Sequence, residues 1–199
     1  MSQLEFSDSH FDVLLADTSE SKRIHYKLRY QVYCDEKKFE DKKQFQDGIE
    51  RDEWDNDATH FLVRHKFTGQ YLGTLRLARS LQYKLPFEKH SSPYRRLNNK
   101  QYYSSVEISR LCVIKEARKF IPRSKTTECL QYAEIKSCNI HDYRPLNHEL
   151  MWRMIRAAAL YSYDIGLKEW YILVSPALDR KSTRLNSSHS DRSRMPSSA

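Results

Sequence analysis

The pattern of hydrophobic and polar positions predicts a chain in which five short strands are interrupted by two helices. Strands are expected where β-branched and aromatic residues cluster between turn residues, and helices where apolar residues recur every three or four positions. The predicted elements, in chain order, are strand Phe11–Ala16, a helix from the capping residues Asp17-Thr18-Ser19-Glu20 to about Lys38, strands Thr59–Phe67, Tyr71–Arg79 and Val106–Ile114, helix Leu146–Tyr163, and strand Trp170–Val174.

The order of these elements predicts an α+β domain built on a mixed sheet. Thr68-Gly69-Gln70 separates two strand-like runs and indicates an antiparallel hairpin. The helix between the last two strands favours a crossover that makes them parallel, with Gly166 at the helix C-cap. An acidic loop over residues 47–57 and a polar connection over residues 80–104 complete the predicted organisation.

In the first predicted helix, Ile24, Leu28 and Val32 recur every four residues and form an apolar ladder. Arg29 and Tyr33 share a neighbouring face of this helix. We therefore expect Arg29 at the edge of the buried stripe.

The strand that begins at Val106 contains both a carboxylate and a guanidinium. Alternation places Glu107 and Ser109 on one face and Arg110 on the other, unless a β-bulge redirects one of them. Because an unpaired buried charge is strongly unfavourable, these side chains need partners. The candidate partners in structured-looking segments upstream are Arg29, Asp52, Asp55 and Arg76. Together these residues form either a structural ion network or a catalytic site.

With 39% hydrophobic and 30% charged residues, the chain has the composition of one soluble globular domain. No segment approaches the roughly 18 apolar residues of a membrane span, and the first twenty residues lack the features of a secretory signal. We expect a cytoplasmic protein.

The four cysteines lack C-x-x-C pairing, which favours reduced thiols. A zinc site from Cys129, Cys138 and His141 is the weaker alternative.

Much of the net charge of +8 lies in a C-terminal tail that resembles translated adapter DNA. Residues 179–199 contain five basic and two acidic residues, so they contribute +3 and leave +5 for the rest of the chain. Residues 179–189 and 193–199 resemble, in frame, the translation of a widely used sequencing-library adapter on either side of an index-sized gap. We interpret residues 179–199 as a non-native, disordered tail and expect the natural sequence to break off near Leu178.

Four ordered blocks resemble the acyl-homoserine-lactone synthase family, which belongs to the GNAT-like N-acyltransferases. The blocks are Leu28–Tyr33, Glu50–Asp55, Gly73–Leu77 and Glu107–Arg110. Three further features resemble the PEP-CTERM/exosortase system-associated acyltransferases and the long-chain N-acyl amino acid synthases: His60, Leu85–Glu88 and Ser175–Leu178. The resemblance covers about residues 20–178. It implies that residues 1–178 form a GNAT-like domain that is incomplete at its C-terminus, because this fold normally adds a helix and further strands.

The resemblance also implies which residues surround the acyl-transfer site. The matching charged cluster consists of Arg29, Asp52, Asp55, Arg76, Glu107 and Arg110. The implied substrate contacts come from Tyr33, Phe39, Ser109, Leu111, Cys112 and Val113. Tyr33 stands where the synthases usually have phenylalanine, and Phe39 roughly where they have tryptophan. These departures weaken the expectation of a homoserine-lactone product more than that of acyl transfer.

The chemistry of N-acylation asks for the same residue types. An amine acceptor must lose a proton before it attacks a thioester, and Glu107 is the candidate base. Backbone N–H groups near residues 110–112 are candidates to bind the oxyanion. Either Arg29 or Arg76 is a candidate to hold an acceptor carboxylate, with Asp52 or Asp55 fixing the guanidinium.

The glycine pattern points to the acyl donor. None of the four glycines lies between Glu107 and Asp164, where a coenzyme A site commonly has a Gly-rich loop. We therefore expect no bound cofactor and favour an acyl carrier protein thioester over acyl-coenzyme A as the donor. The basic residues expected to suit an acidic carrier surface are Lys115, Arg118, Lys119, Arg123 and Lys125.

The expected function is that of a bacterial N-acyltransferase that moves a fatty acyl group to a small amine, with an amino acid favoured. An acyl-homoserine-lactone synthase is the nearest alternative. A non-enzymatic basic module that binds an acidic protein or nucleic acid is the alternative of another class, although we expect no nucleic-acid partner. A metal site at Asp52, Asp55 and Glu107 is disfavoured because Ile108 and Ser109 follow where a nuclease places lysine. We expect no transmembrane segment and leave a peripheral membrane contact open.

Overall fold

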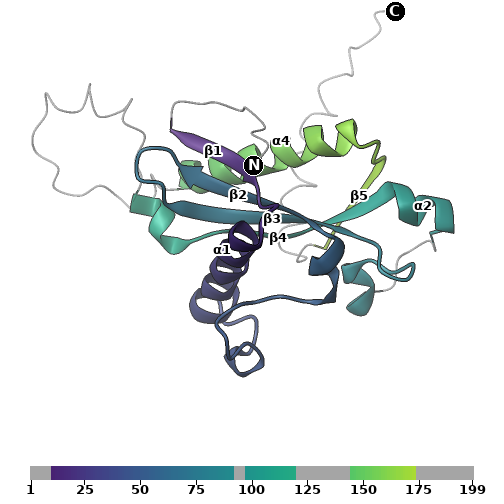
Figure 1. The fold of residues 1–199 in the computed structure, drawn as a ribbon, viewed down its shortest axis with the longest axis horizontal. Coiled ribbons are helices and arrows are strands. Elements are labelled where there is room, and N and C mark those ends of the chain that lie inside the picture. The colour runs from purple at the N-terminus through teal and green to yellow at the C-terminus, as the bar shows by residue number, and fades with distance from the viewer. Residues whose placement is uncertain (1–9, 92–96, 120–143, 174–199) are drawn as a thin grey trace, which may run out of the picture.

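A computed structural model of the chain describes residues 10–91, 97–119 and 144–173 and shows a five-stranded sheet with helices on both faces (Figure 1). The strands are β1 (Phe11–Leu15), β2 (Thr59–His65), β3 (Tyr71–Arg79), β4 (Ser105–Val113) and β5 (Glu169–Ile172). They follow one another in chain order across the sheet. The pairings from β1 to β4 are antiparallel and the β4–β5 pairing is parallel, as the element order predicts. This confirms the mixed α+β sheet.

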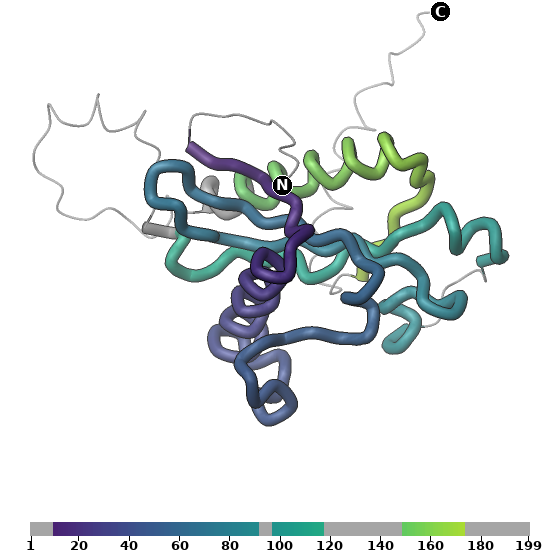
Figure 2. Tube along the Cα trace, in the orientation of Figure 1, coloured from purple at the N-terminus to yellow at the C-terminus, as the bar shows by residue number. Residues whose placement is uncertain are grey.

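Helix α1 (Ser19–Tyr30) covers one face of the sheet and α4 (Arg144–Asp164) covers the other (Figure 2). The Thr18 side chain caps the start of α1 by accepting from the Ser21 backbone N–H at 3.1 Å. Helix α1 runs directly into a π-helical segment, η1 (Gln31–Glu36), so the predicted helix to about Lys38 changes its winding in its last turns. Gly166 follows α4 with a φ of +75°, as expected of a C-cap glycine.

The hydrophobic core lies between the sheet and these two helices. On α4, the fully buried side chains are those of Leu150, Met154, Ala157 and Ala158. Their spacing places all four on one helix face against the sheet. No helix in the described part of the chain is long and apolar enough to cross a membrane.

The segment predicted as a polar connection contains two short helical elements, η4 (Pro86–Lys89) and α2 (Asn99–Ser104). They are stabilised by a second small core in which Leu85, Phe87 and Tyr102 are buried. A capping box between Asn98 and Gln101 begins α2. The sequence pattern missed these elements because the three buried side chains of this second core are widely spaced along the chain.

Strand β4 contains a bulge at the position that matters most for the site. Ser109 pairs with Arg76 and Cys112 pairs with Thr74, so Arg110 and Leu111 lie opposite the single residue Leu75. Arg110 has a φ of +51°, which is uncommon for a residue other than glycine. The bulge therefore interrupts the alternation of side chains along β4, as the sequence analysis allowed.

Candidate active site

Three arginines and four carboxylates gather where α1, β3 and β4 meet the acidic loop. Arg29 comes from α1, Arg76 from β3 and Arg110 from the bulge of β4. The carboxylates closest to them belong to Glu50, Asp52, Asp55 and, at a longer distance, Glu40. The structure thus brings together Arg29, Asp52, Asp55, Arg76 and Arg110, which the sequence singled out.

Asp52 and Asp55 are positioned by the short helical turn η3 (Glu53–Asp57). Asp52 caps this turn by accepting from the Trp54 backbone N–H at 3.1 Å, and Asp55 accepts from the Asp52 N–H at 2.7 Å. The Nε2 atom of His60 lies 3.2 Å from the Asp55 carbonyl oxygen. Because His60 belongs to β2, this contact holds the end of the turn against that strand. The sequence Asp-Glu-Trp-Asp therefore presents two carboxylates from one rigid turn.

Arg29 and Arg76 form the buried half of the network. Arg29 Nη1 lies 2.6 Å from Asp55 Oδ1, and Arg29 Nε contacts Glu50. Arg76 Nη1 lies 2.6 Å from Asp52 Oδ1 and 2.9 Å from Asp55 Oδ1. Burial alone would raise the pKa of Asp55, but the two guanidinium groups more than offset it and hold that pKa well below its usual range.

Both of these arginines are fully buried, with 0% side-chain exposure. This corrects the expectation that Arg29 lies at the edge of the buried stripe of its helix. The reason is that Glu50 and Asp55 neutralise it, which makes burial of the guanidinium tolerable. The half-buried residue of the predicted apolar ladder is instead Ile24.

Arg110 is the arginine at the surface of the network, with 23% of its side chain exposed. Its Nε donates to both Glu50 oxygens at 3.2 Å, and its Nη2 donates to Glu50 Oε1 at 3.0 Å. Within the described residues, its Nη1 has no hydrogen-bond partner. The bulge in β4 is what turns this side chain toward Glu50 and Asp52.

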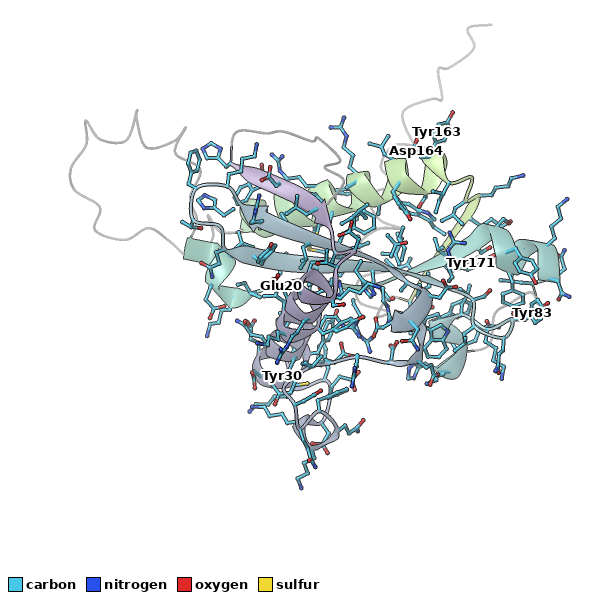
Figure 3. All side chains as sticks on the ribbon, in the orientation of Figure 1. Glu20, Tyr30, Tyr83, Tyr163, Asp164 and Tyr171 are labelled. Carbon is cyan, nitrogen blue, oxygen red and sulfur yellow. The ribbon has the colours of Figure 1, made fainter. Side chains whose placement is uncertain are left out.

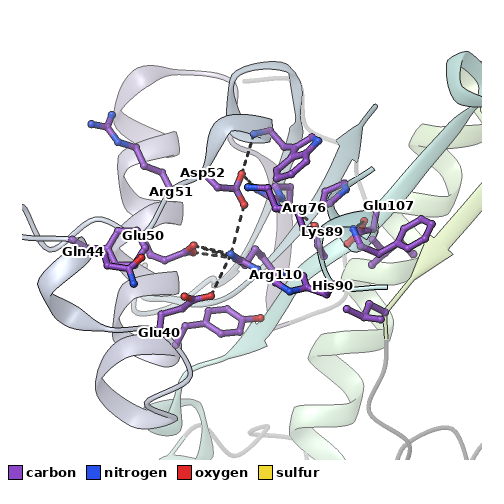
Figure 4. A pocket seen from close by; sticks show the side chains of 18 residues that line it. Glu40, Gln44, Glu50, Arg51, Asp52, Arg76, Lys89, His90, Glu107 and Arg110 are labelled. Carbon is purple, nitrogen blue, oxygen red and sulfur yellow. Dashed lines mark hydrogen bonds and ion pairs between the residues drawn. The ribbon is translucent and has the colours of Figure 1, made fainter. Parts of the chain in front are cut away.

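A cavity of about 630 Å³ opens beside Arg110 (Figure 4). Glu40 and Glu50 lie on one side of Arg110, and Lys89, His90 and Glu107 lie on the other. Most of the residues that line this cavity are polar or charged, so it suits a small hydrophilic molecule. We call it the polar pocket.

Glu107 lines the polar pocket but stands apart from the ion network. Its side chain accepts from the Phe87 backbone N–H at 2.6 Å, and it forms no ion pair with any described residue. Only 4% of the residue is exposed. Burial raises the pKa of Glu107 to about 7, against smaller opposing effects of the Phe87 N–H, Arg76 and Arg110. A carboxyl group with this pKa exchanges protons readily near neutral pH.

A second, smaller cavity of about 240 Å³ adjoins the first, and Tyr33 lines both. We call it the apolar pocket. It contains five of the six predicted substrate contacts: Tyr33, Phe39, Leu111, Cys112 and Val113. The sixth, Ser109, lines the polar pocket and accepts from Arg76 Nε at 3.0 Å. Burial raises the pKa of Cys112 to about 11, so this residue remains a thiol.

The β4 backbone at the bulge lies between the two pockets. Within the described residues, β5 pairs with β4 only as far as Ile108, so residues 109–113 have no strand partner on that side. The Arg110 carbonyl accepts from Thr74 Oγ1 at 2.8 Å. Gly73 permits the close approach of β3, because a Cβ there would lie 2.5 Å from the Cys112 carbonyl oxygen.

Glu50 is the main site residue that the sequence analysis did not single out. It is 1% exposed and bonds both Arg29 and Arg110, so it joins the buried and exposed halves of the network. Burial alone would raise the pKa of Glu50, but these two arginines lower it below its usual value. The available signal was its place in the Glu50–Asp55 block, only two residues before Asp52.

The predicted carrier-docking residues are described only in part. Lys115 is exposed at the start of the short helix η5 (Lys115–Lys119). The side chains of Arg118 and Lys119, and the whole of Arg123 and Lys125, lie outside the described residues. So do the cysteines and histidine of the alternative zinc site.

In the described part of the chain, no group of three or more histidine, cysteine or acidic side chains is arranged to hold a metal ion. Asp52 and Asp55 are engaged by arginines, and Glu107 bonds the backbone of Phe87. The metal alternative at these three residues therefore gains no support from the geometry.

Two similarities to known proteins bear on the fold. Residues 28–121 match the family model described as "Acetyltransferase (GNAT) domain". Among solved structures, the crystal structure of the AHL synthase LasI is similar, with a TM-score of 0.51 and 16% sequence identity over 89% of this chain and 78% of LasI. At this level of identity the likeness shows the fold. No curated protein matches the chain. The fold is thus GNAT-like, and the matched domain within it indicates an acyltransferase.

Proposed function

We propose that the protein is an N-acyltransferase that moves an acyl group from a thioester to the amine of a small polar acceptor. The observation that supports this most is the position of Glu107, a buried carboxyl group with a pKa near neutrality on the wall of the polar pocket. The apolar pocket on the far side of Tyr33 supplies the second half of the site.

In this proposal the acyl chain occupies the apolar pocket. A water-sized group takes about 30 Å³, so a cavity of about 240 Å³ accommodates roughly eight methylene-sized groups. Met151 of α4 contributes to its wall, opposite residues of η1 and β4. The proposed donor is therefore a medium-chain acyl thioester whose carbonyl carbon lies at the bulge between the two pockets.

The acceptor amine occupies the polar pocket. Glu107, ionised, removes one proton from the ammonium form of the acceptor, and the freed amine nitrogen forms a bond to the carbonyl carbon. The carbon–sulfur bond then breaks as the nitrogen gives up its second proton, and that proton leaves with the thiolate as the thiol. Backbone N–H groups of residues 109–113 without a β5 partner are the proposed donors to the oxyanion.

Arg110 is the proposed ligand for an anionic group on the acceptor. Arg29 and Arg76, the two candidates from the sequence, are fully buried and already bonded to carboxylates. Arg76 also lines the polar pocket and has an unpartnered Nη2, but none of its side chain is exposed. Arg110 lines the same pocket, is 23% exposed and retains an unpartnered Nη1 within the described residues. An amino acid, with an amine and a carboxylate, fits Glu107 at one end and Arg110 at the other.

The test is thiol release from a series of acyl donors, with amino acids and homoserine-lactone precursors offered as acceptors. Each acyl group is supplied both on acyl carrier protein and on coenzyme A, and mass spectrometry identifies the N-acyl product. We expect release that depends on the amine. A homoserine-lactone product would favour the synthase alternative. A folded protein that releases no thiol with any donor would favour the non-enzymatic binding module.

A further inference from the structure

A tight turn at one end of the molecule has an unusual backbone. Leu81 and Lys84 form a β-bridge, and the two residues between them, Gln82 and Tyr83, have φ values of +49° and +58°. Turns with two consecutive left-handed residues normally use asparagine and glycine. Non-glycine residues held in this conformation cluster at functional sites, which directs attention to what the turn presents.

The turn presents tyrosine to solvent. Tyr83 is 47% exposed, and Tyr103 of α2 beside it is 70% exposed. Their hydroxyl groups lie 3.2 Å apart, and their rings meet edge to face at 6.0 Å. Figure 3 shows Tyr83 at the end of the molecule next to α2, away from α1. The pair is thus held in place without being buried, as tyrosines at protein interfaces are.

Exposed lysines lie close to both tyrosines in the sequence. Lys84 and Lys100 are exposed and form no ion pair within the described residues. The described parts of residues 79–104 contain four basic residues (Arg79, Lys84, Lys89 and Lys100), of which Lys89 pairs with Glu53, and one acidic residue, Glu88. Glu88 is occupied locally, since it accepts from the Leu85 N–H and the Tyr102 hydroxyl. We call Tyr83, Lys84, Lys100 and Tyr103 the tyrosine–lysine surface.

This surface adjoins the polar pocket. The Trp54 indole N–H donates to the Lys84 carbonyl oxygen at 3.3 Å, and Trp54 lines that pocket. Phe87 and Lys89, a few residues beyond the turn, line it as well. A partner bound at the turn would therefore stand beside the entrance to the site.

We propose that the tyrosine–lysine surface is the docking site for an acidic carrier protein that presents the acyl thioester. The inference rests on the proposed function for the identity of the partner, and on charge complementarity and the exposed tyrosines for its location. It places docking at Tyr83, Lys84, Lys100 and Tyr103 rather than at the basic segment that begins with Lys115. Nucleic acid and anionic membranes share the attraction to lysine, but neither would deliver a thioester to the pocket entrance.

The test separates docking from chemistry by using two donors with the same acyl group. One donor is acyl carrier protein; the other is the N-acetylcysteamine thioester, which needs no docking. The variants are K84E/K100E and Y83A, with K115E as the matched charge-reversal control. Binding of the unacylated carrier protein is measured by surface plasmon resonance at low and moderate salt, and far-UV circular dichroism verifies folding.

We expect K84E/K100E and Y83A to weaken carrier binding at least tenfold and to leave turnover of the small thioester within about twofold of wild type. K115E should bind the carrier as wild type does. Unchanged carrier binding in folded K84E/K100E, or loss of binding in K115E instead, would overturn the proposal. So would binding of single-stranded RNA or anionic vesicles in place of the carrier. Carrier binding that depends on Lys84 and Lys100 without turnover of any donor would refute the proposed function alone.

Discussion

At the scale of single residues, two carboxylates of the site differ in pKa because their surroundings differ. Asp55 lies between two arginines, which hold its pKa well below the usual range. Among the described residues, Glu107 has a single hydrogen-bond partner, the Phe87 backbone N–H, and burial raises its pKa to about 7. One carboxylate is thus fixed as a charge that organises the network, and the other is free to exchange a proton.

This difference predicts an effect of Glu107 on stability. Between its ordinary pKa near 4.5 and about 7, the folded state holds the proton more tightly than the unfolded state, so stability falls as pH rises. Above that window the ionised group destabilises the fold by up to roughly 3 kcal/mol. Urea denaturation should show E107Q more stable than wild type at pH 8 and nearly equal to it at pH 5. A less stable E107Q at pH 8 would contradict the raised pKa.

The geometry of Arg110 leads to a prediction about the KM for the acceptor. Its planar guanidinium engages Glu50 and keeps Nη1 for a ligand, which a lysine ammonium cannot do in the same geometry. We expect R110K to raise the acceptor KM at least tenfold while kcat falls less. R153K, at a surface pair with Glu149 on α4, is the matched control and should leave both constants unchanged. An unaltered acceptor KM in R110K would place the acceptor elsewhere.

At the scale of elements, the strands and long helices could be predicted from the sequence because their hydrophobic periods are regular. The parallel β4–β5 pairing followed from the helix between them. The π-helical turns of η1, the short α2 and the bulge at Arg110 could not be located in this way. Each depends on contacts between distant segments, such as the pairing of Arg110 with Glu50, which no local pattern records.

The position of Met151 on helix α4 leads to a prediction about the length of the acyl chain. Met151 lines the apolar pocket, and the neighbouring Trp152 is exposed and lines neither pocket. Replacing Met151 by alanine enlarges the cavity, so M151A should shift the preferred acyl chain upward by about two or three carbons. The measurement is kcat/KM across a series of acyl thioesters, with W152A as the control. An unchanged chain-length profile in M151A would show that the acyl group binds elsewhere.

At the scale of the whole molecule, the site lies at a junction of elements that the sequence separates widely. Arg29, Glu50 and Arg110 come from three regions of the chain, yet they form one network through the fold. The similarity to a GNAT domain covers residues 28–121, which contains all of these residues. The proposed chemistry therefore lies in the part of the chain before α4, and Met151 of α4 lines the apolar pocket.

The C-terminal tail, residues 179–199, leads to a prediction about the stability and activity of the whole chain. Residues 179–199, which lie outside the described residues, are proposed to be non-native because they resemble translated adapter sequence. Their deletion should leave the melting temperature within about 2 °C and the kcat/KM unchanged. Thermal unfolding and the thiol-release assay check this. A clear loss of stability or activity would show that the tail belongs to the fold.

The measurement that tests the central claim most directly is the pH dependence of kcat/KM for amine-dependent thiol release, in wild type and in E107Q. If Glu107 is the base, the wild-type rate rises with pH through an apparent pKa near 7, and E107Q loses at least about a hundredfold in kcat together with that ascending limb. An E107Q enzyme that retains both the rate and the ascending limb would contradict the account, because another group would then take the proton from the amine.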